Sequence, residues 1–329
     1  MTAQPPTGHP PERPDWRADL DPAEAERVER LDDALGLRLR DPELVHALVD
    51  PRGPLFQRLE WVGDSLLDAV TVRALLERQR WDNPDLGAVS DRRQQLVSDR
   101  ALTRVARVSG LPPVGGFRAS SQRLADRVEA CIGAAWVDAG PVAAAAVARH
   151  LVTDPVLSEQ QVRVTRPPGR GPADLARLEG ALGHGFATPG WAAWAVEPGA
   201  QRRRLALLGD AVLEASSATA LYEELPTADE GVLSERRRAL DNNHRLAAAG
   251  ARLGLRPLRQ GSQGRGSRRR RRADIDRDVA DSVQALVGAV AMDADVPTAI
   301  AAGRRVLGHP PHHGGPDHGP PAPAPRVGP

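Results

Sequence analysis

Four carboxylates occur in two closely spaced pairs whose spacing is suited to holding a metal ion. Glu60 and Asp64 are four residues apart, and Asp126 and Glu129 are three apart, so each pair shares one face of a helix. All four have apolar neighbours, among which ionised carboxylates are costly unless they are paired or bound to a cation. Two such helices packed face to face would present four anionic groups to a hard divalent ion. The alternative is that these are ordinary exposed carboxylates, which are common in a chain with 26% charged residues.

Mg²⁺ suits a ligand set made only of oxygen atoms. It keeps coordination positions open for water and for a phosphate oxygen. A site of this kind can polarise a phosphate group and lower the pKa of the attacking water. If these residues bind such an ion, the chemistry open to them is hydrolysis at phosphate.

The segments that carry these carboxylates belong to a unit that occurs twice in the chain. Four blocks of the first half recur in the same order in the second half, with small changes in offset. The last offset is larger because the second copy contains an arginine-rich insertion. The matched blocks are 29–39 with 176–186, 58–69 with 204–215, 90–96 with 234–240, and 124–139 with 279–294.

The repeated blocks are predicted to be helices. Apolar residues in the segment 58–77 recur near the helical period, and no segment alternates with a period of two. Alanine and leucine are abundant, which also favours helices. Gly63 and Gly209 interrupt the matching helices at a cost of about 1 kcal/mol each relative to alanine, so we expect a close backbone approach there. The fold class is predicted to be all-α.

Composition divides the chain into two domains with flanking tails. Residues 1–22 and 309–329 are rich in proline and glycine and are expected to be disordered. Residues 161–172 have the composition of a linker. The first domain is therefore expected at 23–160 and the second at 173–308, with the arginine-rich insertion at 256–272.

Composition and charge also exclude several classes of protein. No run of 18 apolar residues is present, the first residues lack the apolar core of a signal peptide, and Cys131 is the only cysteine. We therefore expect a cytoplasmic protein with no membrane span, no disulfide within the chain and no cysteine-rich zinc site. The net charge of +1 hides two unlike halves: residues 1–160 hold 20 arginines against 25 acidic residues, whereas residues 161–329 hold 24 against 18.

Several blocks resemble the ribonuclease III family. RLEWVGDSLLDA (58–69), which we call the signature helix, is similar to that family's signature, and LADRVEACIGAAWVDAG (124–140) is similar to its later helix. DEGVLSERRRALDNNHRLAAAGARLGL (229–255) resembles the family's middle block in the second copy. The resemblance implies two tandem ribonuclease III-like helical domains that pair through their signature helices as an intrachain pseudo-dimer. Pairing of two chains through their first copies, as a homodimer, is left open.

The resemblance assigns the metal-binding role to the first copy's carboxylates. Gln57 and Leu86 depart from the family pattern, since acidic residues are usual at both positions. These departures put a second metal ion in doubt but leave the main site intact. The residues expected to hold Mg²⁺, for which Mn²⁺ is an expected substitute, and to carry catalysis are Glu60, Asp64, Asp126 and Glu129.

The second copy keeps only half of this set. Asp210 and Asp281 remain, whereas Ala206 and Gln284 replace the two glutamates, so metal binding there should be crippled. Glu230 stands where the first copy has Leu86. Because family dimers pair through the signature helices, Glu230 is a candidate contributor to the first copy's centre across the interface.

Eight arginines and no acid lie between positions 256 and 272. Such a run is often a solvated loop that binds nothing. In a nuclease without a recognisable double-stranded-RNA-binding domain, contact with phosphate is the better interpretation. The arginines expected to bind RNA are Arg265, Arg268, Arg269, Arg270, Arg271 and Arg272.

The function predicted from the resemblance is a Mg²⁺-dependent endoribonuclease that cleaves double-stranded RNA during RNA processing, with ribosomal RNA as one candidate substrate. One active centre per chain is expected. The alternative is a non-catalytic RNA-binding or ribosome-assembly protein that retains the scaffold. Loss of ligands in the second copy favours this alternative, and the complete carboxylate set in the first copy argues against it.

Overall fold

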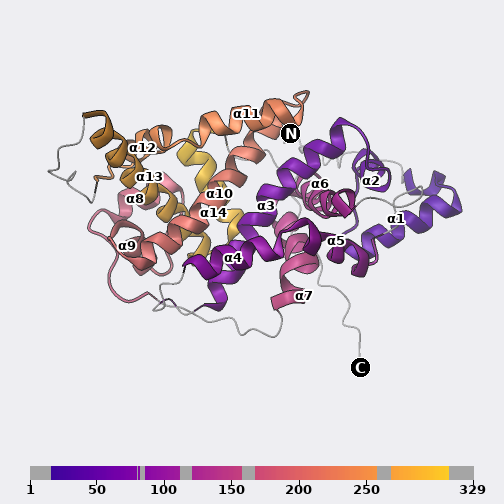
Figure 1. Ribbon diagram of the computed structural model, residues 1–329, viewed down its shortest axis with the longest axis horizontal. Coiled ribbons are helices and arrows are strands. Elements are labelled where there is room, and N and C mark those ends of the chain that lie inside the picture. The colour runs from indigo at the N-terminus through magenta and orange to yellow at the C-terminus, as the bar shows by residue number, and fades with distance from the viewer. Residues whose placement is uncertain are drawn as a thin grey trace, which may run out of the picture.

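The computed structural model describes residues 16–79, 81, 86–111, 121–157, 167–257 and 268–310. Within these ranges every regular element is a helix and no strand occurs, which confirms the all-α prediction (Figure 1). The elements of the first copy are η1 (Trp16–Asp19), α1 (Pro22–Leu35), α2 (Pro42–Val49), α3 (Pro54–Arg78), α4 (Leu86–Leu96), α5 (Asp99–Val108), α6 (Ser121–Ala148), η2 (Arg149–Thr153) and α7 (Asp154–Leu157).

The second copy repeats this order. Its helices are α8 (Leu175–Leu182), α9 (Gly190–Val196), α10 (Ala200–Glu224), α11 (Glu230–Leu240), α12 (Asn243–Arg252), α13 (Arg268–Asp293) and α14 (Val296–Leu307). The signature helix of the first copy lies within α3, and its counterpart lies within α10. Each packs on the long apolar helix of its own copy, α6 or α13.

Local sequence explains where several of these helices begin. Asp21 caps α1 by accepting hydrogen bonds from the backbone N–H groups of Ala23 and Glu24, and Asp229 caps α11 by accepting one from Val232. The apolar positions of α3 are buried as the helical period predicts: Leu59, Val62, Leu66, Leu67, Val70 and Leu75 are each at most 4% exposed. Their burial fixes which face of α3 is left for the polar residues.

Glycine allows the two long helices of each copy to touch backbone to backbone. A Cβ atom built on Gly63 would lie 1.9 Å from the carbonyl oxygen of Glu129, and one on Gly209 would lie 1.7 Å from that of Gln284. From the opposite helix, a Cβ atom on Gly133 would lie 2.0 Å from the carbonyl oxygen of Leu59. The expected close backbone approach at Gly63 and Gly209 is confirmed.

The two copies pair through α3 and α10, which lie side by side at the centre of the molecule (Figure 1). Arg58 is the first residue of the signature helix, and its side chain is buried in the pairing. Its guanidinium donates to the carbonyl oxygens of Tyr222 in the last turn of α10 and of Leu225 and Ala228 after that helix, and lies 4.4 Å from the centroid of the Tyr222 ring. The signature-helix pairing that the sequence predicted is therefore made within one chain.

A tryptophan cluster closes the other end of this pairing. Trp81 follows α3, and its ring centroid lies 5.0 Å from that of Trp191 and 5.5 Å from that of Trp194, both on α9. Arg73 of α3 also donates to the carbonyl oxygens of Ala291 and Ala294 at the end of α13. Contacts at both ends of α3 thus connect the first copy to the second.

The expected N-terminal tail is too long. Its last residues form η1 and the start of α1, and Trp16 donates a hydrogen bond to the carbonyl oxygen of Arg40. Residues 1–15, the segment 158–166 with the first half of the linker, the middle of the arginine-rich insertion (258–267) and residues 311–329 lie outside the described residues. His309, assigned to the C-terminal tail, lies 2.8 Å from a carboxylate oxygen of Glu224.

One helical stretch, Gln122–Leu157, is long and apolar enough to cross a membrane by length and composition alone. This stretch comprises α6, η2 and α7, and 56% of its most apolar window is buried inside the molecule. A core helix of a soluble protein has the same properties. The expectation that the chain has no membrane span therefore stays a prediction.

Candidate metal centre

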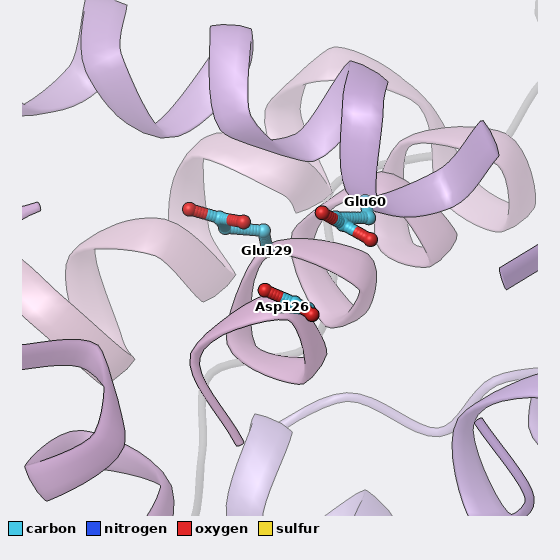
Figure 2. Close-up of side chains that lie close together, drawn as sticks. All are labelled: Glu60, Asp126 and Glu129. Atoms are coloured by element: carbon cyan, nitrogen blue, oxygen red, sulfur yellow. The ribbon is translucent and has the colours of Figure 1, made fainter. Parts of the chain in front are cut away.

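The glycine contact between α3 and α6 places three carboxylates around a common space. Glu60 precedes Gly63 on α3, while Asp126 and Glu129 precede Gly133 on α6, so all three side chains lie beside the point where the backbones touch. One carboxylate oxygen from each of the three lies within 4.8 Å of the others. Figure 2 shows the glutamate from one helix directed toward the two acids from the other. All three side chains are half-buried.

The electrostatics of this group disfavour the ionised form. Burial, assisted by the charges of Asp64, Glu60 and Asp126, raises the pKa of Glu129 to about 9. Burial, together with the charges of Asp126 and Glu230, raises the pKa of Glu60 to about 7. The pKa of Asp126 is also raised, mainly by burial, against a lowering hydrogen bond from the amide of Gln122 at 2.8 Å.

Asp64, the fourth predicted ligand, stands beside this group and not within it. It lies one turn beyond Glu60 on α3, and its charge is the leading electrostatic influence on the pKa of Glu129. Loss of surrounding water raises the pKa of Asp64 itself, and the guanidiniums of Arg237 and Arg93 lower it. Asp64 therefore links the three-carboxylate group to the junction between the two copies.

The residues present fit a hard divalent cation. The group offers only oxygen ligands, supplied by two rigid helices whose spacing is fixed by the glycine contact, and these ligands are open enough to leave coordination positions free. Three mutually repelling carboxylates with raised pKa values are the environment that a bound cation relieves. Mg²⁺ or Mn²⁺ would be held by Glu60, Asp126 and Glu129, with Asp64 beside them.

The second copy has replaced this arrangement with a hydrogen bond. The amide of Gln284 on α13 donates to a carboxylate oxygen of Asp210 on α10 at 2.6 Å, at the place equivalent to Glu129 and Asp64. Ala206 contributes no ligand, and Asp281 is left as the only other carboxylate of the set. No acidic group of this kind was found in the second copy within the described residues. The hydrogen bond from Gln284 thus engages the carboxylate of Asp210, which a metal ion would need as a ligand.

Glu230 lies near the first copy's centre, on the first turn of α11. Its charge is one of the causes that raise the pKa of Glu60, so the two carboxylates are electrostatically coupled across the interface. The side chain is exposed. Its counterpart Leu86 begins α4 in the first copy, so no second carboxylate is supplied to the degenerate site from that position.

The arginines of the insertion lie at the start of α13. Residues 268–272 are helical, and the side chain of Arg272 is exposed. Arg265 lies outside the described residues, as do the side chains of Arg268, Arg269, Arg270 and Arg271. Asp281 follows Arg272 by nine residues, about 14 Å along the helix axis. The arginine run is therefore attached to the same helix as the degenerate site.

Sequence reasoning missed the contacts that α11 makes with the signature helix. Trp61 donates to the hydroxyl of Ser234 at 2.9 Å, and Arg237 donates to the hydroxyl of Ser65 at 2.6 Å. The repeated block that contains Arg237 was recognised, but its partners lie more than 170 positions away in the sequence. Such pairs follow from the angle between the copies, which no local pattern specifies.

The fold and the site define a helical protein with two copies of one domain and a carboxylate centre in the first. The ribonuclease III domain model matches residues 57–140 and 203–295, more than half of the chain. The chain belongs to the ribonuclease III family.

Named relatives agree with this assignment. Ribonuclease 3 of Leifsonia xyli subsp. xyli is 37% identical over 137 residues, which cover 36% of this chain and 56% of the relative. Ribonuclease 3 of Pseudomonas putida is 41% identical over 133 residues, covering 39% of this chain and 56% of the relative. The matches thus span little more than half the length of these relatives.

A solved structure matches the fold over more of the chain than one copy occupies. Dicer from Giardia intestinalis matches with a TM-score of 0.52 and 15% identity, covering 77% of this chain and 55% of that chain. At this identity the likeness concerns the fold alone. It supports two paired copies in one chain as the architecture.

Proposed function

We propose that this protein is a Mg²⁺-dependent endoribonuclease that hydrolyses phosphodiester bonds in double-stranded RNA, with one active centre per chain. The observation that carries the proposal is the contrast between the copies. In the first copy the carboxylates of Glu60, Asp126 and Glu129 lie close together, where their negative charges repel one another. In the second copy Gln284 donates a hydrogen bond to Asp210. Family membership supports the class of reaction and substrate, and it extends the proposal to a cytoplasmic location and to ribosomal RNA as a candidate substrate.

The chain's own residues would perform three tasks in this reaction. When bound, the cation supplies Lewis acidity toward a phosphate oxygen and a lowered pKa for the attacking water. Glu60, Asp126 and Glu129 hold the site in a fixed geometry because α3 and α6 are in backbone contact. Asp64 adds negative charge beside them, and Glu230 contributes from across the interface. The arginines that begin α13 would hold the RNA backbone.

The test compares the same substitution in the two copies. End-labelled duplex RNA is incubated with Mg²⁺ and with wild type, Asp64→Asn or Asp210→Asn. We expect Asp64→Asn to abolish cleavage and Asp210→Asn to retain it, because only the first copy has the full carboxylate set. Glu230→Gln is the third variant: a reduced rate supports its contribution, and wild-type kinetics would discard it. Equal loss in both aspartate variants would contradict a single centre.

The competing function is a non-catalytic RNA-binding or ribosome-assembly protein. It is favoured by the loss of ligands in the second copy and by Gln57 and Leu86 in the first. Absence of cleavage by the wild type under these conditions, together with binding of the same duplex, would establish this alternative. The intact carboxylate group argues against it, because binding alone does not require three acids clustered at one point.

Removal of the arginine run tests the role of the second copy in holding RNA. Replacing Arg268–Arg272 with serine should weaken duplex affinity and flatten its dependence on salt by about 0.9 in log–log slope for each phosphate that the protein no longer neutralises. Turnover at saturating RNA should change little, because the run supplies none of the carboxylates that would hold the cation. Binding measured between low and moderate salt checks the slope. Reduced turnover with unchanged binding would contradict this role.

A further inference from the structure

One face of α11 in the second copy lies along the signature helix of the first. Glu230, Ser234 and Arg237 are spaced four and three residues apart, so they share a helix face. This face meets α3 where the catalytic carboxylates begin: Ser234 accepts a hydrogen bond from Trp61, and Arg237 donates to Ser65. Trp61 follows Glu60 directly, and Ser65 follows Asp64 directly.

Arg237 makes two direct contacts with α3 and acts electrostatically on a third side chain of that helix. Its guanidinium donates to Ser65 Oγ at 2.6 Å, lies 5.1 Å from the centroid of the Trp61 ring, and attracts the carboxylate of Asp64. Trp61 and Ser65 are buried, at 6% and 2% exposure. A planar guanidinium can stack on an aromatic ring with its face and, at the same time, donate hydrogen bonds from its edge. An ammonium group cannot do both. These contacts fix the rotation of α3 about its axis at Trp61 and Ser65, the residues that follow Glu60 and Asp64.

On the other side of the pseudo-twofold axis, Arg93 likewise lowers the pKa of Asp210, but among the described residues it has no equivalent of the hydrogen bond to Ser65 or of the contact with the Trp61 ring. Arg93 occupies the position of Arg237 but pairs with Asp68 of its own copy at 2.7 Å. Leu207 and Ala211 stand on α10 where α3 has Trp61 and Ser65, so neither a stacking ring nor a hydroxyl is offered to Arg93. The second copy therefore supports the first copy's helix through a hydrogen bond and a ring contact that the first copy does not make in return.

We infer that Arg237 is a positioning residue, contributed by the degenerate copy, that holds the signature helix of the first copy at the orientation its carboxylates need. This inference rests on the proposed function for its catalytic consequence, while the contact itself is independent of it. The second copy lacks two of the four metal ligands and has the helix that supports the other centre.

The kinetic test uses Arg237→Ala, Arg237→Lys and the control Arg236→Ala, which removes the same charge from an exposed position on the same helix. We expect kcat to fall on the order of tenfold to a hundredfold in Arg237→Ala, as misplaced catalytic groups do, with KM within about twofold of wild type. Arg237→Lys should recover part of kcat, and Arg236→Ala should leave it unchanged. Unchanged kcat, or a rise in KM alone, would overturn the positioning role.

A second measurement separates this inference from the proposed function. In a double-mutant cycle, the shift in denaturation midpoint of Arg237→Ala with Ser65→Ala should be smaller than the sum of the two single shifts. The pair Arg236→Ala with Ser65→Ala should be additive. If wild type does not cleave RNA, the proposed function fails, and the catalytic consequence assigned to Arg237 fails with it. The cycle then still decides whether the contact exists, and additivity for Arg237 and Ser65 would overturn it whatever the activity.

Discussion

Glu129 and Glu60 are placed where an ionised carboxylate is unfavourable unless a cation is present. Burial and neighbouring acids raise the pKa of Glu129 to about 9 and that of Glu60 to about 7. In the second copy, glutamine at the position of Glu129 removes one charge and gives Asp210 a hydrogen-bond donor. The two copies thus differ in a few side chains at equivalent positions, and these side chains decide which copy presents a carboxylate group that a bound cation would relieve.

The metal-free protein should lose stability as pH rises. Because the folded pKa of Glu129 lies above its ordinary 4.5, the folded state retains a proton that the unfolded state releases, and the stabilising contribution present below about pH 4.5 is lost progressively up to about pH 9. Urea unfolding with a chelator at pH 5, 7 and 9 measures the decline. Glu129→Gln should flatten it, whereas Glu29→Gln, at an exposed site, should not. Equal slopes in all three proteins would contradict the assignment.

At the scale of the helices, the centre depends on a contact that only glycine permits. Gly63 and Gly133 allow the backbones of α3 and α6 to touch, and the carboxylates lie at the edge of that contact. The sequence predicted this approach, because a glycine inside an apolar helix needs a reason. Periodicity within single segments also predicted the helices themselves. The four carboxylates were assigned by the family resemblance, and three of them lie together in the structure.

Gly63→Ala should therefore destabilise the protein despite alanine's better helix propensity. Its Cβ atom would lie 1.9 Å from a backbone oxygen, so α3 and α6 must separate, at a cost of about 1–3 kcal/mol in the free energy of unfolding. The control is Gly180→Ala, at an exposed position in α8 with nothing within 4 Å, which should stabilise by about 0.5–1 kcal/mol. Chemical denaturation checks both. Stabilisation by Gly63→Ala would contradict the close contact.

At the scale of the whole molecule, the two copies act as one unit through α3 and α10. Pairing of the signature helices could be predicted from the family resemblance. The contacts between Arg237, Ser65 and Trp61 could not, because they join residues of different copies at an angle set by the packing of both. The hydrogen bond from Gln284 to Asp210 was also missed, since the sequence shows a missing ligand but not the side-chain interaction that takes its place.

The most direct test of the central claim, that one copy cuts, is the number of strands cleaved in a single binding event. The protein is bound to duplex RNA labelled differently on each strand, and Mg²⁺ is added together with excess unlabelled duplex to prevent rebinding. The account predicts cleaved strands on a denaturing gel while the duplex stays whole on a native gel, with Asp210→Asn behaving as wild type. Double-strand breaks formed at the rate of the first cut would contradict it.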